Sequence, residues 1–262
     1  MQYFRIYRIT PPFRVKLYQK LFFILVCSIG FIGCDTGSGG GEDFLPIPIV
    51  DRDDPAIVPI AKIDSWWVER HTNRINNVIN NQKMILIGDS ITHYWEGTEA
   101  WDILNTKYNN KITNLGFGAD QTQHVIWRLI NGEFPVGINP EYVVLMIGTN
   151  VSSGDQPASV AAGIGEIIKI INSASPSTKI ILLSIFPRGT DNNNARRIFN
   201  NSVNNIIKTY NGHLNVMYYD IGQYYMDKNG ILTNELYDAD LLHLSSLGYI
   251  LWKNKIIELI GD

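Results

Sequence analysis

Short apolar runs alternate along most of the chain with longer stretches in which apolar residues recur at helical spacing. Five runs rich in Ile, Val and Leu predict strands, at residues 84–87, 111–115, 142–147, 180–186 and 214–219. Because most of these runs do not alternate between apolar and polar positions, we expect strands that are buried on both faces. The stretches around them predict helices, at residues 60–80, 121–131, 157–172, 194–210 and 246–260.

The order of these elements predicts the fold class. Strands that alternate with helices are typical of an α/β fold, in which a parallel sheet is covered by helices on both faces. We therefore expect one domain over residues 60–262, without internal repeats. Ligands of such folds bind outside the carboxyl ends of the strands. The polar residues that follow each predicted strand are thus the first candidates for a functional site.

The first 34 residues have a different pattern and predict a lipoprotein-type signal peptide. Five basic residues and no acid precede an apolar run of 13 residues, from Leu21 to Gly33. A membrane span needs about 20 residues, whereas the core of a signal peptide needs about 7–15. The run ends at Gly33-Cys34, which resembles the site where bacterial lipoproteins are cut and lipidated, although Phe31 stands where that pattern prefers an aliphatic residue.

We therefore expect lipidation at Cys34, export, and a lipid anchor in the bacterial periplasm or on the cell surface. An uncleaved short anchor and an ordinary secretory signal cut elsewhere are the alternatives. Residues 35–59 begin with a Gly-rich stretch and continue with four prolines and five acids from residue 42 onward. This composition predicts a flexible linker.

Composition and charge exclude several classes of function. The chain is 45% hydrophobic and 18% charged, which excludes a disordered protein. Its net charge is −3, and since the first 34 residues carry +5, the remainder carries −8. Such an acidic domain is a poor partner for nucleic acid. Both cysteines, Cys27 and Cys34, precede the domain, so we expect no disulfide, no thiolate metal site and no cysteine nucleophile in it.

Polar residues follow the first and third predicted strands, and another polar pair lies near the C-terminus. Ser90 ends a Gly-Asp-Ser turn, Asn150 ends a Gly-Thr-Asn segment, and Asp240 precedes His243 by three residues. Each feature alone has an ordinary explanation as a turn, a helix cap or a buried histidine. Together they supply a nucleophile, an oxyanion donor, an orienting acid and a base, which are the parts of a serine hydrolase.

These segments resemble the conserved blocks of the GDSL or SGNH hydrolases. Gly88-Asp89-Ser90 is similar to the first block, Gly148-Thr149-Asn150 to the third, and Asp240 with His243 to the last. The resemblance runs from about residue 64 to the end and is closest to the branch of the platelet-activating-factor acetylhydrolase catalytic subunits and exported bacterial acetyl esterases. It implies a three-layer α/β/α sandwich on a five-stranded parallel sheet of flavodoxin-like order.

The same resemblance implies a role for each matching residue. Ser90 would be the nucleophile, His243 the general base and Asp240 its orienting acid. The oxyanion hole would use the Ser90 N–H, the N–H at Ala119 and the Asn150 side chain, although the family usually has glycine where this chain has Ala119. Five further residues would shape the loops of the site, namely Gly88, Asp89, Gly116, Gly118 and Gly148.

We therefore expect an exported serine esterase that removes short acyl groups, above all acetyl, from a carbohydrate or lipid, without cofactor or metal. An O-acyltransferase, a lipase or lysophospholipase, and a catalytically silent glycan-binding module are the alternatives. The sequence does not indicate the oligomeric state.

His93 and His124 are expected to be structural or to line the substrate site. Five tryptophans are candidates for a sugar site, although tryptophan more often packs in the core or at its rim, namely Trp66, Trp67, Trp95, Trp101 and Trp127.

Overall fold

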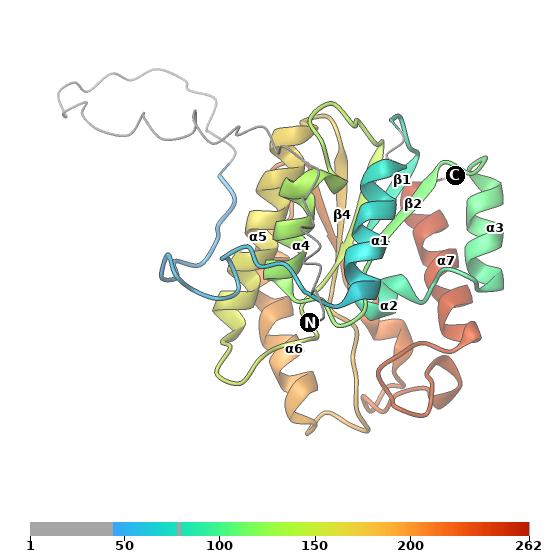
Figure 1. Cartoon of the computed structure of the whole chain (residues 1–262). Helices are drawn as coiled ribbons and strands as arrows, with labels where there is room; N and C mark the ends of the chain where they lie inside the picture. The colour runs from blue at the N-terminus through green and yellow to red at the C-terminus, as the bar shows by residue number, and fades with distance from the viewer. Residues whose placement is uncertain (1–43, 78–79, 262) are drawn as a thin grey trace, which may run out of the picture. The chain divides into compact units, whose positions relative to one another are not determined.

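The computed structural model describes residues 44–77 and 80–261 (Figure 1). The predicted signal peptide, the predicted lipidation site at Cys34 and the first part of the predicted linker lie outside these residues. Within the described ranges, no helix is both long and apolar enough to cross a membrane.

A parallel sheet of five strands forms the centre of the described structure. The strands are β1 (Met84–Gly88), β2 (Ile112–Gly116), β3 (Tyr142–Met146), β4 (Lys179–Leu183) and β5 (Val216–Tyr219). Their order across the sheet is β2-β1-β3-β4-β5, and every neighbouring pair is parallel. This is the flavodoxin-like order, so the predicted fold class is confirmed. The order reverses between β1 and β3, and ligands of such sheets bind outside the carboxyl ends at this point.

Helices cover both faces of this sheet (Figure 1). The longer ones are α1 (Ser65–Asn76), α3 (Glu99–Lys107), α4 (Thr122–Arg128), α5 (Pro157–Ala174), α6 (Ala195–Ile207) and α7 (Ser246–Ile260). The shorter turns of helix are α2 (Ser90–His93), η1 (Leu129–Glu133), η2 (Lys208–Tyr210), η3 (Gly222–Tyr225) and η4 (Asn234–Leu236). Helices α4, α5 and α6 pack on one face, whereas α3 and α7 pack together on the other.

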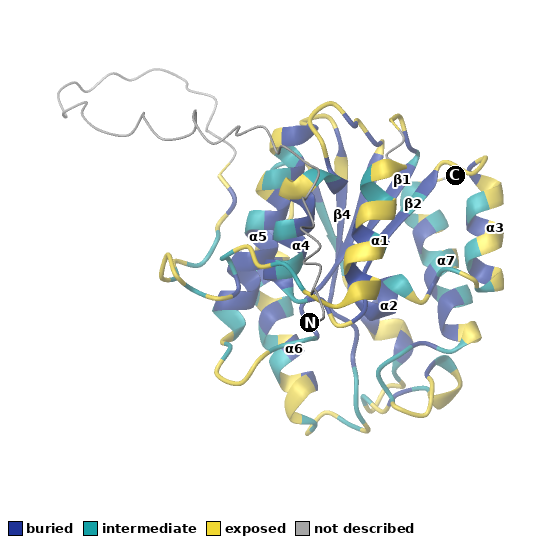
Figure 2. Cartoon of the chain, viewed as in Figure 1, coloured by how far each residue is buried: buried dark blue, intermediate teal, exposed yellow. Residues whose placement is uncertain are grey.

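Two apolar cores hold the three layers together, one on each side of the sheet. Successive residues of β3 serve both, because Val143 packs with the α5 side and Val144 with the α7 side. Every residue of β1 and β3 is buried, and the strands are dark blue in Figure 2. Burial of one such aliphatic side chain contributes about 1.5–3 kcal/mol. The sheet is therefore a rigid base for the residues that follow its strands.

The structure differs from the sequence prediction at some element boundaries. The predicted helix over 60–80 begins only at Ser65, because Asp64 has extended backbone angles and acts as the N-cap. Helix α3 was not predicted, although Thr98 caps it through a hydrogen bond from the Trp101 N–H to its hydroxyl. A Thr followed by acids in the first turn is a helix-start signal that the sequence contained.

The segment 44–59, part of the predicted linker, packs on the domain. Leu45 is buried in the core on the α5 side. The Thr122 hydroxyl donates to the Ala56 carbonyl at 2.8 Å, and the Ser159 hydroxyl donates to Asp54 at 2.6 Å. The packed part of the chain therefore begins before residue 60, and these contacts fix the segment against α4 and α5.

Candidate active site

Ser90 lies at the point where β1 turns sharply into α2. Asp89 is the N-cap of α2 and accepts a hydrogen bond from the Ile91 N–H at 3.0 Å. Gly88 makes this turn possible, because a Cβ atom there would lie 2.5 Å from the Met146 carbonyl and 2.2 Å from the Thr92 hydroxyl. The turn places Ser90 as the first residue of α2, at the carboxyl end of a central strand.

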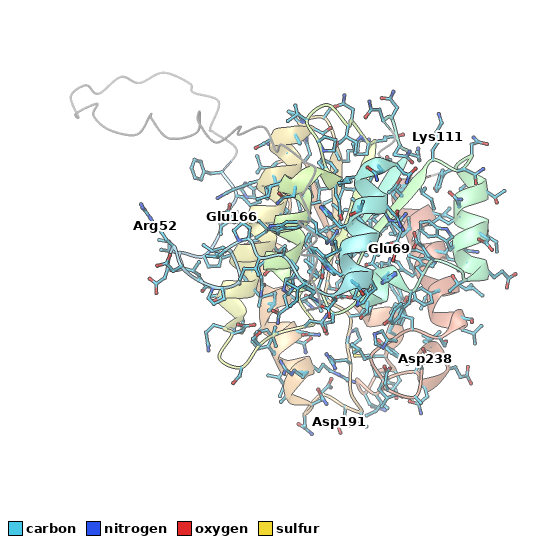
Figure 3. The ribbon with its side chains drawn as sticks, viewed as in Figure 1. Arg52, Glu69, Lys111, Glu166, Asp191 and Asp238 are labelled. Carbon is cyan, nitrogen blue, oxygen red and sulfur yellow. The ribbon has the colours of Figure 1, made fainter. Side chains whose placement is uncertain are left out.

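A hydrogen-bonded chain links Ser90 to a loop near the C-terminus. The Ser90 Oγ lies 2.9 Å from His243 Nε2, and His243 Nδ1 lies 2.5 Å from Asp240 Oδ2. The other Asp240 oxygen accepts hydrogen bonds from the N–H groups of Leu242 and His243. In Figure 3, Asp238 beside this loop lies at the opposite end of the domain from Lys111, which precedes β2. The loop is therefore at the carboxyl ends of the strands.

The electrostatics of this chain favour a charged Asp240 beside the imidazole. Burial acts to raise the pKa of Asp240, but the hydrogen bonds from the backbone and ring of His243 outweigh it and hold that pKa below its ordinary value. A carboxylate at Nδ1 keeps the proton on that nitrogen. The Nε2 atom is then free to accept the proton of the Ser90 hydroxyl.

Two further segments carry amide groups to the same end of the sheet. Asn150 follows β3, and its side chain donates one hydrogen bond to the Asp120 carbonyl at 3.1 Å. A side-chain amide has two N–H bonds, so one remains available. The Asp120 N–H donates to the Phe117 carbonyl and closes a turn, in which Ala119 has a φ of +57°. Within the described residues, the Ala119 N–H has no hydrogen-bond acceptor.

A buried polar network fixes this turn from the interior of the domain, and the sequence pattern did not predict it. The Asp120 carboxylate accepts from Trp67 Nε1 at 2.8 Å and from Arg128 Nε at 2.9 Å. Arg128 also pairs with Glu133, which bonds His71, and all four of these ionisable side chains are buried. Removing one partner of a buried ion pair costs about 3–5 kcal/mol. The available signal was Arg128 itself, a charge between the apolar residues of a predicted helix.

The segment after β3 is held by residues that follow β4. Arg188 Nη1 donates to the Thr149 carbonyl and hydroxyl, at 3.3 and 3.2 Å. The Asn200 side chain donates to the same hydroxyl at 3.2 Å. Gly148 precedes this residue with a φ of +123°, a conformation that favours glycine. These contacts fix the backbone from which Asn150 extends.

The predicted loop-shaping glycines differ in how strictly the surrounding atoms exclude a side chain at their position. A Cβ atom on Gly116 would lie 2.4 Å from the His93 backbone nitrogen, so the backbone at the end of β2 touches that of α2. A Cβ atom on Gly118 would lie 3.5 Å from Trp66, which is ordinary contact. Gly118 therefore does not need to be glycine for steric reasons. Asp89 is buried, and its burial, together with Asp120, raises its pKa to about 7 despite the hydrogen bond from Ile91.

His93 and His124, which the sequence did not assign to the triad, both accept hydrogen bonds from the backbone. His93 Nδ1 accepts from the Gly118 N–H at 3.2 Å, and His124 Nδ1 accepts from the Gln121 N–H at 3.0 Å. His124 thereby caps α4. In residues 44–77 and 80–261, no group of three or more His, Cys, Asp or Glu side chains is placed to hold a metal ion.

Comparison with known proteins identifies the class and the family. A model of the GDSL-like lipase/acylhydrolase family matches residues 86–251. Platelet-activating factor acetylhydrolase IB subunit alpha1 of Homo sapiens is 31% identical over 198 residues, which cover 74% of this chain and 83% of the relative. The alpha2 subunit of Rattus norvegicus is 33% identical over 202 residues, 74% of this chain and 85% of the relative. The chain is thus a hydrolase. It belongs to the GDSL-like lipase/acylhydrolase family.

Solved structures share the fold at lower sequence identity. A GDSL-like lipase from Bacteroides thetaiotaomicron has a TM-score of 0.56 at 18% identity, covering 74% of this chain and 96% of its own. A variant of an acetyl-xylooligosaccharide esterase from Geobacillus has a TM-score of 0.55 at 16% identity, covering 71% and 96%. The parallel sheet and its covering helices are therefore common to these proteins.

The contact of Gly116 with α2 predicts different costs of substitution at Gly116 and at Gly118. Gly116→Ala should lower the free energy of unfolding by about 2–3 kcal/mol, because the methyl group forces two backbones apart. Gly118→Ala should change it by less than about 1 kcal/mol. Urea denaturation of the two variants measures both values, and equal losses would contradict the contact.

The raised pKa of Asp89 predicts a pH dependence of stability. The native state keeps the proton between pH 3.8 and about 7 while the unfolded chain releases it, so stability falls as the pH rises through this window. The slope is on the order of 1 kcal/mol per pH unit. Asp89→Asn keeps the cap and removes the titration. Urea denaturation from pH 5 to 8 should show wild type losing stability relative to this variant, and parallel curves would exclude a buried titrating Asp89.

Proposed function

We propose that this hydrolase is a serine esterase that removes short acyl groups, chiefly acetyl, from an alcohol. The observation that carries the proposal is the hydrogen-bonded chain from Ser90 Oγ through His243 to Asp240. The hydroxyl, the imidazole and the carboxylate stand in the order that nucleophilic acyl transfer requires. They meet at the carboxyl ends of the strands, where sheets of this order bind ligands.

The reaction takes place in two steps. Ser90 Oγ attacks the ester carbonyl while its proton passes to His243 Nε2, and the charge that forms on the imidazole is stabilised by Asp240. His243 then gives the proton to the alcohol as the bond to it breaks, which leaves an acyl group on Ser90. Water then attacks this acyl group while its proton passes to His243, and His243 returns the proton to Ser90 Oγ as the carboxylic acid leaves.

Three N–H groups are proposed to bind the negative oxygen of each tetrahedral intermediate. They are the Ser90 N–H, the Ala119 N–H and the free N–H of the Asn150 side chain. The hydrogen bond from Asn150 to the Asp120 carbonyl supports this role, because it fixes the amide before substrate arrives. Donors that are fixed in advance stabilise developing charge without the cost of reorganisation.

The preference for short acyl groups rests on the sequence and on the relatives. No long apolar insertion that could cover a long acyl chain lies between Ser90 and His243, and the loop after Asn150 is short and polar. A long chain gains about 0.8 kcal/mol per buried methylene only where a groove exists to bury it. The relatives named above include acetylhydrolases and an acetyl-xylooligosaccharide esterase, which supports acetyl as the acyl group and a sugar as one candidate for the alcohol.

A panel of simple esters tests this proposal. With p-nitrophenyl acetate, propionate, butyrate and octanoate, kcat/KM should fall as the chain lengthens. Ser90→Ala should lower kcat about 10⁶-fold, as loss of such a nucleophile does in a serine protease. Asn150→Ala should lower kcat about 10²–10³-fold with little change in KM.

The matched control is Ser202→Ala, since the Ser202 hydroxyl bonds only to a carbonyl of its own helix. This variant should keep wild-type kinetics and should still react with a fluorophosphonate, whereas Ser90→Ala should not react. A folded Ser90→Ala variant that keeps a tenth of the activity would show that Ser90 is not the nucleophile. A higher kcat/KM for octanoate would make the protein a lipase. Acyl transfer to a glycan acceptor in place of water would make it an acyltransferase.

We further propose that the chain is exported and anchored by a lipid on Cys34. The basic residues, the short apolar run and the Gly33-Cys34 junction of the first 34 residues support this placement. Cys34→Ser should shift the protein in a bacterial host from the membrane fraction to the soluble fraction or leave it unprocessed, because one lipid-modified residue supplies the anchor. Fractionation with mass spectrometry of the N-terminus measures this outcome. A mature-sized variant that stays in the membrane fraction would contradict it.

A further inference from the structure

A row of aromatic rings leads from α1 to the candidate site. The rings of Trp66, His93 and Tyr94, called here the aromatic wall, lie next to one another. The Trp66 and His93 centroids are 6.0 Å apart with an angle of 20° between the rings, and those of His93 and Tyr94 are 5.4 Å apart. The Tyr94 ring lies 5.1 Å from the His243 ring. The wall therefore ends beside the imidazole whose Nε2 contacts Ser90.

The wall borders the turn that carries Ala119 as well. A Cβ atom on Gly118 would lie 3.5 Å from the edge of Trp66 and 3.8 Å from both His93 Nδ1 and the Tyr94 hydroxyl. Gly118 immediately precedes Ala119, whose N–H is proposed to bind the oxyanion. As a group, the three rings thus border both the turn that carries Ala119 and the ring of His243.

Exposure distinguishes Trp66 and Tyr94 of this wall from the tryptophans of the core. Trp66 is 43% exposed and Tyr94 is 51% exposed, whereas Trp67 is 1% and Trp95 is 0% exposed. The buried tryptophans pack in the interior, as expected for most tryptophans. Exposed aromatic rings beside a site can bind a ligand, because a ligand that covers them removes their apolar surface from water, which is favourable.

The edges of the wall carry polar groups without protein partners. His93 Nδ1 accepts a hydrogen bond from Gly118, so in the neutral ring the proton is on Nε2. Burial, with Arg70 nearby, lowers the pKa of His93 to about 4, which keeps the ring neutral. The His93 Nε2, the Trp66 Nε1 and the Tyr94 hydroxyl make no hydrogen bond within the described residues. The wall offers ring faces and uncharged polar edges.

We infer that the aromatic wall is the subsite for the alcohol part of the ester and that it binds a sugar ring. The inference rests on the proposed esterase function. The leaving alcohol receives its proton from His243 Nε2, so it lies beside His243, and the Tyr94 ring flanks that residue. A sugar places its C–H face on aromatic rings and its hydroxyls against their polar edges. A lipid alcohol would cover the same polar edges without bonding them, which costs free energy.

The test compares a sugar ester with an ester whose alcohol is too small to extend from His243 to Trp66, at the far end of the wall. Trp66→Ala should raise KM for an O-acetylated xylo-oligosaccharide about tenfold, with kcat kept within about twofold. For ethyl acetate, the same variant should keep both constants within about twofold. Trp66→Phe should restore most of the affinity for the sugar ester, because it restores a ring face.

Matched controls come from residues of similar exposure. Val68 is also exposed on α1, and Tyr224 is 48% exposed outside the wall. Val68→Ala and Tyr224→Ala should leave both substrates unaffected, whereas Tyr94→Ala should raise KM for the sugar ester. Equal losses on ethyl acetate and on the sugar ester in Trp66→Ala would overturn the subsite. A larger rise in KM for a lysophospholipid than for the sugar ester would assign the wall to a lipid alcohol instead.

Binding without turnover separates this inference from the proposed function. The unacetylated xylo-oligosaccharide should bind the Ser90→Ala protein, by calorimetry, about tenfold more tightly than it binds Ser90→Ala with Trp66→Ala. If no ester is hydrolysed by wild type but this difference persists, the esterase proposal fails and the sugar subsite remains. If esters are hydrolysed but the oligosaccharide binds both proteins equally weakly, the esterase stands and the sugar subsite is wrong.

Discussion

The buried pair between Asp120 and Arg128 is the interaction on which the candidate site depends most. Asp120 uses its carboxylate in the interior, its N–H to close a turn and its carbonyl to hold the Asn150 side chain. Arg128 in turn donates to the Leu115 carbonyl at the end of β2. One buried contact thus positions two of the three donors of the proposed oxyanion hole, the Ala119 N–H and the Asn150 side chain, relative to the sheet. Its desolvation is offset because each carboxylate oxygen has a donor.

The sheet converts positions that are distant in sequence into one site. Parallel strands end at the same edge, so Ser90 after β1 and Asn150 after β3 lie on neighbouring strands of the sheet. The turn after β2 lies on the other side of β1. The Asp240–His243 loop completes the arrangement from the chain that follows β5. No metal or cofactor is part of the proposed chemistry, because the sheet and its loops already bring a nucleophile, a base and donors together.

The sequence predicted the strands and the residues at their ends because both signals are local. An apolar run and a Gly-Asp-Ser turn are visible in a few residues. The contacts behind the site were not predictable in this way, since Trp67 and Asp120 are 53 residues apart and meet only in the folded chain. Exposure was not predictable either. Trp66 and Trp67 are adjacent in the sequence, yet α1 turns one toward the site and the other into the interior. Helix α3 was missed although Thr98 and the acids after it marked its start.

The φ of +57° at Ala119 has a consequence for the entropy of the site. An alanine in the left-handed region is strained by about 1–2 kcal/mol relative to its preferred conformations, a cost that glycine does not have. In exchange, alanine has fewer conformations open to it than glycine has. The strain is maintained by the buried carboxylate of the next residue. Part of the stability of the fold is therefore spent on holding the Ala119 N–H in one direction. The buried contacts of Asp120 hold the turn in this conformation.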